Sequence, residues 1–312
     1  MSRIAIIDMG TNTFHLLIAN AGKEGYEIIH RGHEAVKIGE AGINEGFITE
    51  NACRRAIATM EKFRETIDDK GVITVYAFGT SALRNAKNGR TLAGEINTAT
   101  GITVRIISGE EEADYIFEGV KAALDLGSDG NLVMDIGAGS VEFILGNRHE
   151  VFWKQSFEIG GQRLLEKFQK HDPISADEIN QLDAYFESEL RPLQKALQKF
   201  KPKTLVGSSG TFDTLSDIFS IRHKLPGTNE QPETPLSTEG FYEIYEELIR
   251  KNRSERMNIA GMIEMRVDMI VVSCCLIRHI LEAHRFERIR VSSYSLKEGV
   301  LAMLAAGHGT SR

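Results

Sequence analysis

The sequence predicts an α/β protein built of two similar lobes, and three observations lead to this prediction. Apolar strand patterns alternate with helix patterns along the 312 residues, which is typical of α/β units around a mixed or parallel sheet. The length itself suggests two domains. A turn sequence occurs twice, because Asp8-Met-Gly-Thr-Asn-Thr13 matches Asp135-Ile-Gly-Ala-Gly-Ser140 at an offset of 127 residues. We therefore expect two lobes that face one another across a cleft, each contributing one turn.

The first half of the chain is expected to contain four strands and three helices. The strands are predicted at residues 3–8, 15–20, 72–78 and 102–107, the first two forming a hairpin. A helix follows Thr49 and ends near Gly71, because Ala56, Met60 and Phe63 belong to one apolar stripe. Two more helices are predicted, over residues 83–98 and after Ser108.

The second half begins at the Gly-, Asp- and Ser-rich stretch 127–130, which is the best candidate for a domain boundary. Strands are predicted at 132–134, 142–145, 204–206 and 289–292, and the first two form a second hairpin. Residues 175–200 are strongly helical in pattern, and helices are also expected after residue 237 and over 294–306. The stretch 227–237 holds three of the six prolines and is predicted to be a surface loop.

Composition excludes several classes of function. The net charge of −7 argues against a general nucleic-acid-binding surface. The three cysteines form no CxxC pair, so neither a disulfide framework nor a zinc site is indicated. The longest apolar run, residues 267–277, is far shorter than the ~20 residues of a membrane span. We therefore expect a soluble, cytoplasmic protein with no nucleic-acid or membrane partner.

The two repeated turns have the composition of phosphate-binding loops. Glycine allows close approach of a ligand to the backbone, whose amides can cradle phosphate oxygens. Such donors come from Gly10, Thr11, Asn12 and Thr13 in the first turn and from Gly137, Ala138, Gly139 and Ser140 in the second. Asp8 and Asp135, at the strand ends, could hold a divalent metal. Ordinary hairpin turns use the same residue types, but two copies at equivalent places favour a phosphate clamp.

A third candidate loop, residues 207–211, lies between a strand and an apolar helix. An anion could bind at Ser209, Gly210 and Thr211, because the backbone amides of a helix N-terminus point outward. Helix capping is the simpler explanation of the same residues. The chain has no GxxxxGK(S/T), which excludes a P-loop nucleoside triphosphatase on motif grounds.

Acidic and basic side chains outside these turns supply candidate catalysts. Ser108 and Glu111 fit a capping box at the start of a helix. Glu112 lies beside the apolar stripe of that helix, so its carboxylate should face the interior or a cleft and could serve as a general base. Arg84, just past a strand end, could clamp a phosphate. Glu142 could share a metal, with an ordinary strand position as the alternative for it.

Together these segments resemble the exopolyphosphatase/guanosine pentaphosphate phosphohydrolase family. The matching stretches occur in family order and span almost the whole chain: IAIIDMGTNTFHLLIA, GTSALRNAKN, ISGEEEADYIFEGV, LVMDIGAGSVEFILG, VGSSGTFDTL and SSYSLKEGVL. The resemblance implies a two-lobed, actin-like (ribonuclease H-like) fold with an active-site cleft between the lobes. The lobes would be residues 1–126, completed by the C-terminal helix 294–312, and residues 127–293.

The resemblance also implies a reaction, namely hydrolysis of terminal phosphoanhydride bonds with Mg²⁺. Glu112 falls on the catalytic glutamate of the family and Arg84 on a substrate-contacting arginine. The second phosphate motif of the family covers Asp135, Gly137, Gly139, Ser140 and Glu142. With Asp8, the two acids Asp135 and Glu142 form the expected metal site.

The chain departs from the family pattern at several positions. Ala138 replaces the middle glycine of a triple-glycine turn, where a methyl group would crowd a phosphate if the turn needed positive φ. Val141 replaces a common threonine, and Ser293-Tyr294 stands where Asp-Gly is usual. By this resemblance we expect a short form of the family, without the extra C-terminal helical domain of longer members.

The expected function is an exopolyphosphatase that releases orthophosphate from linear inorganic polyphosphate. Three alternatives stay open. The substrate could be guanosine pentaphosphate, which would tie the protein to the stringent response. The fold also permits a kinase or an ATP-driven conformational protein. A binding protein that senses polyphosphate or alarmone without turnover is the third. Whether the chain forms a homodimer is also left open.

Overall fold

The computed structural model describes residues 2–22, 25–225 and 231–307. Backbone contacts divide the chain into two units: unit 1 comprises residues 1–122 with 295–312, and unit 2 comprises residues 123–294. The Gly127–Gly130 stretch therefore lies just inside unit 2.

Unit 1 is built on a mixed five-stranded sheet in the order β3-β2-β1-β4-β5. Its strands are β1 (Ser2–Met9), β2 (Thr13–Gly22), β3 (Gly25–Ala35), β4 (Thr74–Gly79) and β5 (Val104–Ile106). The first three are antiparallel, while β4 runs parallel to β1 and β5 parallel to β4. The predicted hairpin and the strands near 72–78 and 102–107 are confirmed. Strand β3 was not predicted, because its many polar residues and largely exposed positions hide the apolar alternation.

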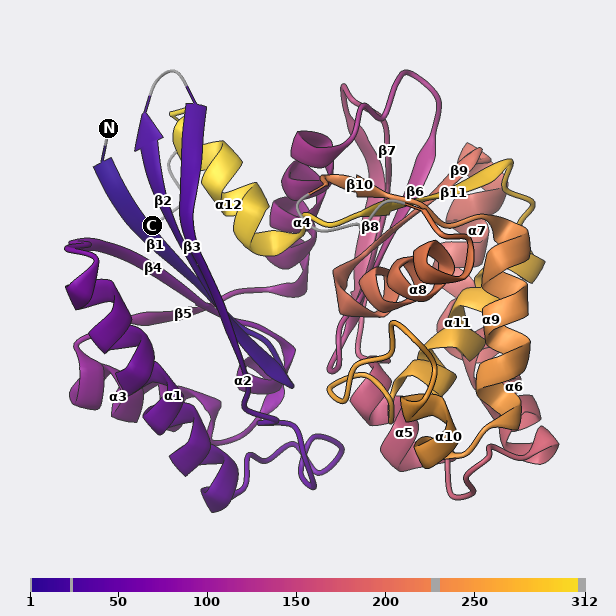
Figure 1. The fold of residues 1–312 in the computed structure, drawn as a ribbon, viewed down its shortest axis with the longest axis horizontal. Coiled ribbons are helices and arrows are strands. Elements are labelled where there is room, and N and C mark those ends of the chain that lie inside the picture. The colour runs from indigo at the N-terminus through magenta and orange to yellow at the C-terminus, as the bar shows by residue number, and fades with distance from the viewer. Residues whose placement is uncertain (1, 23–24, 226–230, 308–312) are drawn as a thin grey trace. The chain divides into compact units, whose positions relative to one another are not determined.

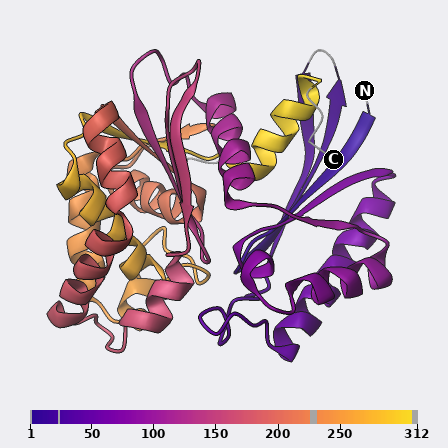
Figure 2. The ribbon, with the colours of Figure 1, turned by 180° about the vertical axis from the view of Figure 1, so that it is seen from behind.

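Helices cover both faces of the unit 1 sheet (Figures 1 and 2). Helices α1 (Glu50–Asp69) and α3 (Gly89–Thr100) pack on one face and enclose a core with Ala5, Ile7 and Met9. On the other face, α12 (Leu296–Ala305) contacts β1, β2 and β3. Helix α4 (Gly109–Ala123) lies against α12. Helix α1 begins after Thr49, as predicted, and the Thr49 side chain accepts a hydrogen bond from the Ala52 amide as its cap.

The helix predicted over residues 83–98 is wrong as a single element. The structure has a short helix α2 (Ser81–Asn85), a break, and then α3. At the break, the Asn88 side-chain amide donates to the Ile48 carbonyl at 2.8 Å. A Cβ on Gly89 would lie 2.0 Å from the Leu83 carbonyl oxygen, so the chain folds back tightly there. A tertiary contact to Ile48 thus overrides the local helical pattern.

Unit 2 contains a mixed six-stranded sheet in the order β10-β11-β9-β6-β7-β8. Its strands are β6 (Asn131–Ile136), β7 (Val141–Gly146), β8 (Val151–Phe157), β9 (Thr204–Ser208), β10 (Glu233–Thr234) and β11 (Arg288–Ser292). The predicted second hairpin is β6 with β7. The segment predicted to be a loop over 227–237 contains β10, while its residues 227–230 lie outside the described residues.

Seven helices lie in the described part of unit 2: α5 (Gly161–Phe168), α6 (Ala176–Glu189), α7 (Arg191–Phe200), α8 (Ser209–Arg222), α9 (Thr238–Arg250), α10 (Arg253–Met257) and α11 (Ile270–Ala283). Their apolar faces share one core with strands β6, β7 and β9 (Figure 1). No helix in the ranges that the structure describes is long and apolar enough to cross a membrane.

The two sheets have the same topology, which extends the repeat first seen in the turns. The order β3-β2-β1-β4-β5 corresponds to β8-β7-β6-β9-β11, with matching parallel and antiparallel neighbours. The offset of 127 also relates the core-facing residues: Ala5, Ile7 and Met9 correspond to Leu132, Met134 and Ile136. Asp8 and Asp135 therefore occupy equivalent positions on the opposite side of their strands.

Candidate active site

The two repeated turns have the same hydrogen bond. The Gly10 amide donates to the Thr13 carbonyl at 3.1 Å, and the Gly137 amide donates to the Ser140 carbonyl at 3.0 Å. A Cβ on either glycine would approach that carbonyl oxygen to 2.9 or 3.0 Å. Neither glycine has a positive φ. Glycine is favoured at these positions because the turn closes tightly on itself.

Carbonyl oxygens of both turns are bound by the protein itself. In unit 1, Thr11 and Asn12 accept from the amides of Gly39 and Lys37, at 3.1 and 2.9 Å. In unit 2, the carbonyls of residues 137, 138 and 139 accept from the amides of residues 161, 162 and 160, all within 3.2 Å. Arg163 Nε adds a bond to the Gly139 carbonyl at 2.8 Å. Because these oxygens are bound by protein donors, they are held away from a bound anion, which the turn amides could then approach.

The Ala138 methyl group does not strain its turn. Within the described ranges, positive φ at non-glycine residues occurs at Lys37, Ala41, Lys201, Ser209 and Lys224, so Ala138 has an ordinary backbone conformation. The condition under which the Ala138 methyl group was expected to crowd a phosphate, a positive φ at this residue, is therefore not met. What constrains this turn is Gly160, since a Cβ there would lie 2.4 Å from the Ala138 carbonyl carbon.

Gly160→Ala should therefore weaken the affinity of the protein for inorganic phosphate by about tenfold or more, because the added methyl group must displace the turn. Isothermal titration calorimetry with inorganic phosphate measures this directly. Ala138→Gly is the matched control, and its affinity should stay within about twofold of the wild type. Equal affinities for the Gly160 variant and the wild type would contradict a binding role for this turn.

Two carboxylates lie side by side at the end of strand β6. Asp135 and Glu142 are register partners across β6 and β7, and they are 4% and 1% exposed. Both oxygens of Asp135 accept hydrogen bonds from Ser209 Oγ, at 2.8 and 2.7 Å, and one also accepts from Ser208 Oγ at 2.6 Å. Glu142 accepts from Ser156 Oγ at 2.7 Å.

The segment predicted as a third glycine loop, residues 207–211, is not a loop. Gly207 and Ser208 end strand β9, and α8 begins at Ser209 with no residue between them. Ser209 makes the sharp turn with a φ of 70°, which is uncommon for a residue other than glycine. The junction places Ser209 on the Asp135 carboxylate and keeps Gly210 and Thr211 in the first helical turn.

Arg266 is a candidate site residue that the sequence analysis missed. Its guanidinium lies flat on Gly210, where a Cβ would come within 2.2 Å of Nη2. Its Nε is buried and has no hydrogen-bond partner among the described residues. Burial lowers the pKa of this guanidinium, an effect that the carboxylates of Asp213 and Asp135 oppose. Arg266 lies in an irregular segment without periodicity, so no local pattern indicated it.

In unit 1, Arg84 and Glu112 form a partly buried ion pair. Arg84 follows β4 on α2, and Glu112 lies in the first turn of α4 after β5. Since β4 and β5 are parallel neighbours, the segments that follow them lie at the same edge of the sheet. Arg84 Nη1 donates to Glu112 Oε2 at 2.8 Å and to the Ile107 carbonyl at 3.2 Å. The two side chains are only 17% and 10% exposed.

Glu111, which directly precedes Glu112, has a more exposed environment. The Glu111 amide donates a hydrogen bond to Ser108 Oγ at 3.1 Å, so the Ser108 side chain caps the helix. The Glu111 carboxylate pairs with Arg105 and is 35% exposed. Glu112 as a whole is 7% exposed. The inward orientation expected for Glu112 from the helical pattern is therefore what the structure has.

The predicted metal ligands lie in both units. Asp8 is on β1, opposite His15 of β2, whereas Asp135 and Glu142 are in unit 2. Over the residues that the structure describes, no three His, Cys, Asp or Glu side chains gather into a metal-binding group. Mg²⁺ is commonly held by a few protein carboxylates together with oxygens of water and of the bound ligand.

Comparison with known proteins agrees with this architecture. An exopolyphosphatase structure from Cytophaga hutchinsonii is 44% identical, with a TM-score of 0.96, and the match covers 100% of both chains. Exopolyphosphatase 1 of Mycobacterium tuberculosis is 25% identical over 96% of this chain and 87% of that protein. The guanosine-5'-triphosphate,3'-diphosphate pyrophosphatase of Photobacterium profundum is 26% identical over 95% of this chain and 58% of that protein.

The doubled sheet topology is that of an actin-like fold. The Ppx/GppA phosphatase family model matches residues 17–308, which include the second turn, the Arg84–Glu112 pair, the Asp135–Glu142 pair and Arg266, but not the first turn at residues 10–13. By its fold, its repeated turns and this match over nearly all of its length, the chain belongs to the Ppx/GppA phosphatase family.

Proposed function

We propose that this protein is an exopolyphosphatase, which hydrolyses the terminal phosphoanhydride bond of linear inorganic polyphosphate. The observation that supports this most directly is the Glu112–Arg84 pair, with 2.8 Å between the carboxylate and the guanidinium. A carboxylate shielded from solvent can accept a proton from water, and a guanidinium beside it can stabilise a phosphoryl oxygen. The names of the relatives point to the same chemistry.

In the proposed reaction, Glu112 orients a water molecule and takes its proton. The water oxygen forms a bond to the terminal phosphorus, while the bond from that phosphorus to the bridging oxygen breaks. The shortened chain leaves with the bridging oxygen and its electron pair, and orthophosphate is released. Arg84 stabilises the charge on the transferred group. Reactions of this kind depend mainly on positioning and electrostatics.

The remaining candidate residues are proposed to hold the phosphate chain. Backbone amides of the two turns, at residues 10–13 and 137–140, would contact phosphate oxygens. The first turn of α8, with Ser209, Gly210 and Thr211, would bind a further phosphate with the help of Arg266.

Mg²⁺ fits the acidic residues of unit 2. Asp135 and Glu142 are buried register partners whose carboxylate oxygens are the ligands this hard cation prefers. Asp8, at the equivalent place in unit 1, is the third proposed ligand. Bound there, the ion would neutralise charge on the terminal phosphates.

The first experiment measures Mg²⁺-dependent phosphate release from long polyphosphate, short polyphosphate and guanosine pentaphosphate. We expect release from polyphosphate, and we expect Asp135→Asn to lower kcat/KM by about 10²-fold or more at saturating Mg²⁺. A variant that keeps the wild-type kcat/KM would remove Asp135 from the proposed metal site. If the protein binds these substrates but releases phosphate from none of them, the hydrolase hypothesis is wrong and a binding protein that senses the substrate is favoured.

Guanosine pentaphosphate is the second candidate substrate, because the Photobacterium relative is named for this type of reaction. Competition between polyphosphate and guanosine pentaphosphate in one assay decides which has the higher kcat/KM. A kinase would instead show nucleotide-dependent phosphate transfer. The cytoplasmic location, the absence of nucleic-acid and membrane partners, and the homodimer remain predictions.

A further inference from the structure

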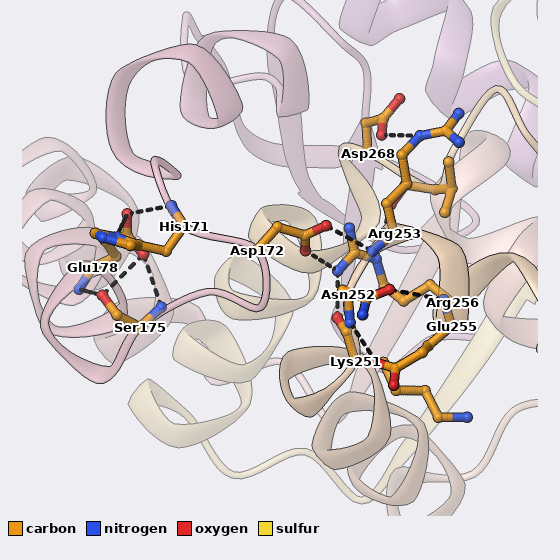
Figure 3. A network of polar contacts seen from close by, with 11 residues as sticks. His171, Asp172, Ser175, Glu178, Lys251, Asn252, Arg253, Glu255, Arg256 and Asp268 are labelled. Atoms are coloured by element: carbon orange, nitrogen blue, oxygen red, sulfur yellow. Dashed lines mark hydrogen bonds and ion pairs between the residues drawn. The ribbon is translucent and has the colours of Figure 1, made fainter.

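A buried arginine in unit 2 joins three separate segments of the chain. Arg256, in α10, is 1% exposed. Its Nη1 donates to Asp172 Oδ1 at 2.6 Å and to the Lys251 carbonyl at 2.5 Å. Its Nε donates to the Val267 carbonyl at 3.1 Å. Figure 3 shows the Asp172 carboxylate directed toward Arg256.

Arg253 extends this network to the residue after Val267. Its backbone amide donates to Asp172 Oδ2 at 2.6 Å, so both oxygens of Asp172 are used. Its Nε donates to Asp268 Oδ1 at 2.8 Å (Figure 3). Asp172 therefore fixes two arginines that together hold positions 267 and 268.

These two positions directly follow Arg266, whose guanidinium lies on Gly210 at the start of α8. The segment that carries Arg266 is irregular between α10 and α11. It touches α8 a second time at Gly261, where a Cβ would lie 2.8 Å from the Ile218 amide nitrogen. The contacts of Arg256 and Arg253 therefore fix the C-terminal end of this segment, next to Arg266. The close approach of Gly261 to α8 fixes its middle.

We propose that Asp172 and Arg256 are positioning residues, which keep the Arg266 guanidinium in place to bind a phosphate of the substrate. This inference rests on the proposed function, in which Arg266 contacts a phosphate at the first turn of α8. The Arg256 guanidinium suits the task because its planar fork reaches several acceptors at once, which a lysine ammonium on a flexible stem does not. A rigid support of this kind is what a precisely placed binding group requires.

Kinetics of Asp172→Asn and Arg256→Lys test the proposal. Asp172→Asn keeps the side-chain size and removes the charge, and Arg256→Lys keeps the charge and removes the planar fork. We expect each to raise KM for polyphosphate by about tenfold and leave kcat within about twofold, since Arg266 would bind the substrate and the transition state alike. The same substitutions are then made in an Arg266→Met background. There the change in KM should shrink to less than about twofold, because the group being positioned is gone.

Glu178, in the first turn of α6, provides a matched control because it binds the backbone of the loop that carries Asp172. It accepts hydrogen bonds from the amides of Lys170, His171 and Ser175 at 2.6, 3.0 and 2.8 Å (Figure 3). Burial raises the pKa of Glu178, but the hydrogen bonds from Ser175, Lys170 and His171 outweigh it and bring the pKa to about 2. Glu178→Gln should lower Tm as Asp172→Asn does, yet leave KM unchanged.

The possible results separate this inference from the proposed function. An equal rise in KM in the wild-type and Arg266→Met backgrounds would overturn the positioning role, as would a similar rise for Glu178→Gln. If no substrate is hydrolysed, the four proteins of the Asp172–Arg266 cycle are compared by the Tm increase that inorganic phosphate produces. If the two substitutions reduce that increase in Tm non-additively, the positioning role is supported while the exopolyphosphatase activity is rejected.

Discussion

Replacing Glu112 by glutamine should lower kcat for phosphate release from polyphosphate by about 10²- to 10⁴-fold. The glutamine oxygen can still accept the hydrogen bond that Arg84 now donates at 2.8 Å, so the local geometry is retained. Only the ability to take a proton from water is lost. Initial rates at saturating polyphosphate and Mg²⁺ measure the change in kcat, and KM should change little because Glu112 would contact the water rather than the chain.

Glu111→Gln is the control for this experiment. Glu111 precedes Glu112 in the same helical turn, but its carboxylate pairs with Arg105 and is 35% exposed. We expect its kcat to stay within about twofold of the wild type, since surface ion pairs contribute little. If both variants lost activity equally, the effect would come from the charge of the helix N-terminus, and Glu112 would not be the general base.

The features that the sequence predicted well are those encoded by neighbouring residues. The turn hydrogen bonds at Gly10 and Gly137 follow from a short motif present twice, between apolar strands that periodicity reveals. The inward orientation of Glu112 follows from its position on the helix that begins after Ser108. The C-terminal helix also has its predicted extent to within two residues.

Features that depend on contacts distant in sequence could not be predicted. Arg266 contacts Gly210 from an irregular segment, and no pattern in the neighbouring residues distinguishes Arg266 from a solvated arginine. The break before α3 depends on Asn88 binding the backbone of Ile48, 40 residues earlier. Ser209 takes its positive φ because it must reach Asp135 on a strand 74 residues earlier in the chain.

The two halves share a topology but carry different chemistry. At the position equivalent to Glu142, unit 1 has His15, which is the register partner of Asp8. Unit 2 thus has a pair of buried carboxylates, while the ion pair of Arg84 and Glu112 belongs to unit 1. On the proposed mechanism, cation binding and proton transfer are therefore assigned to different copies of one structural repeat.

Gly299→Ala should destabilise unit 1 by about 3 kcal/mol, the upper end of the usual cost of overpacking. A Cβ on Gly299 of α12 would lie 1.7 Å from the Tyr115 carbonyl oxygen and 2.7 Å from the Gly119 amide nitrogen of α4. Both are backbone atoms, so no side chain can rotate away. The two helices must separate, and the expected fall in Tm is roughly 6–12 °C. Differential scanning calorimetry measures it.

Gly94→Ala separates this contact from the general effect of replacing a helical glycine. Gly94 lies on the exposed side of α3, with nothing within 4 Å of an added Cβ. Its replacement should stabilise the protein by about 0.5–1 kcal/mol, because alanine loses less conformational entropy in a helix. A Gly299 variant as stable as the Gly94 variant would show that α4 and α12 can separate without cost.

The Gly299 variant also shows how rigidly Glu112 must be held. Tyr115 lies three residues after Glu112 on α4, so a displacement of α4 away from α12 carries the carboxylate with it. A small misplacement of a catalytic group can reduce a rate by about 10²-fold. We therefore expect kcat to fall at temperatures where the variant is still folded. If Tm falls and kcat does not, α12 supports the fold of unit 1, and the position of Glu112 is set by its ion pair with Arg84.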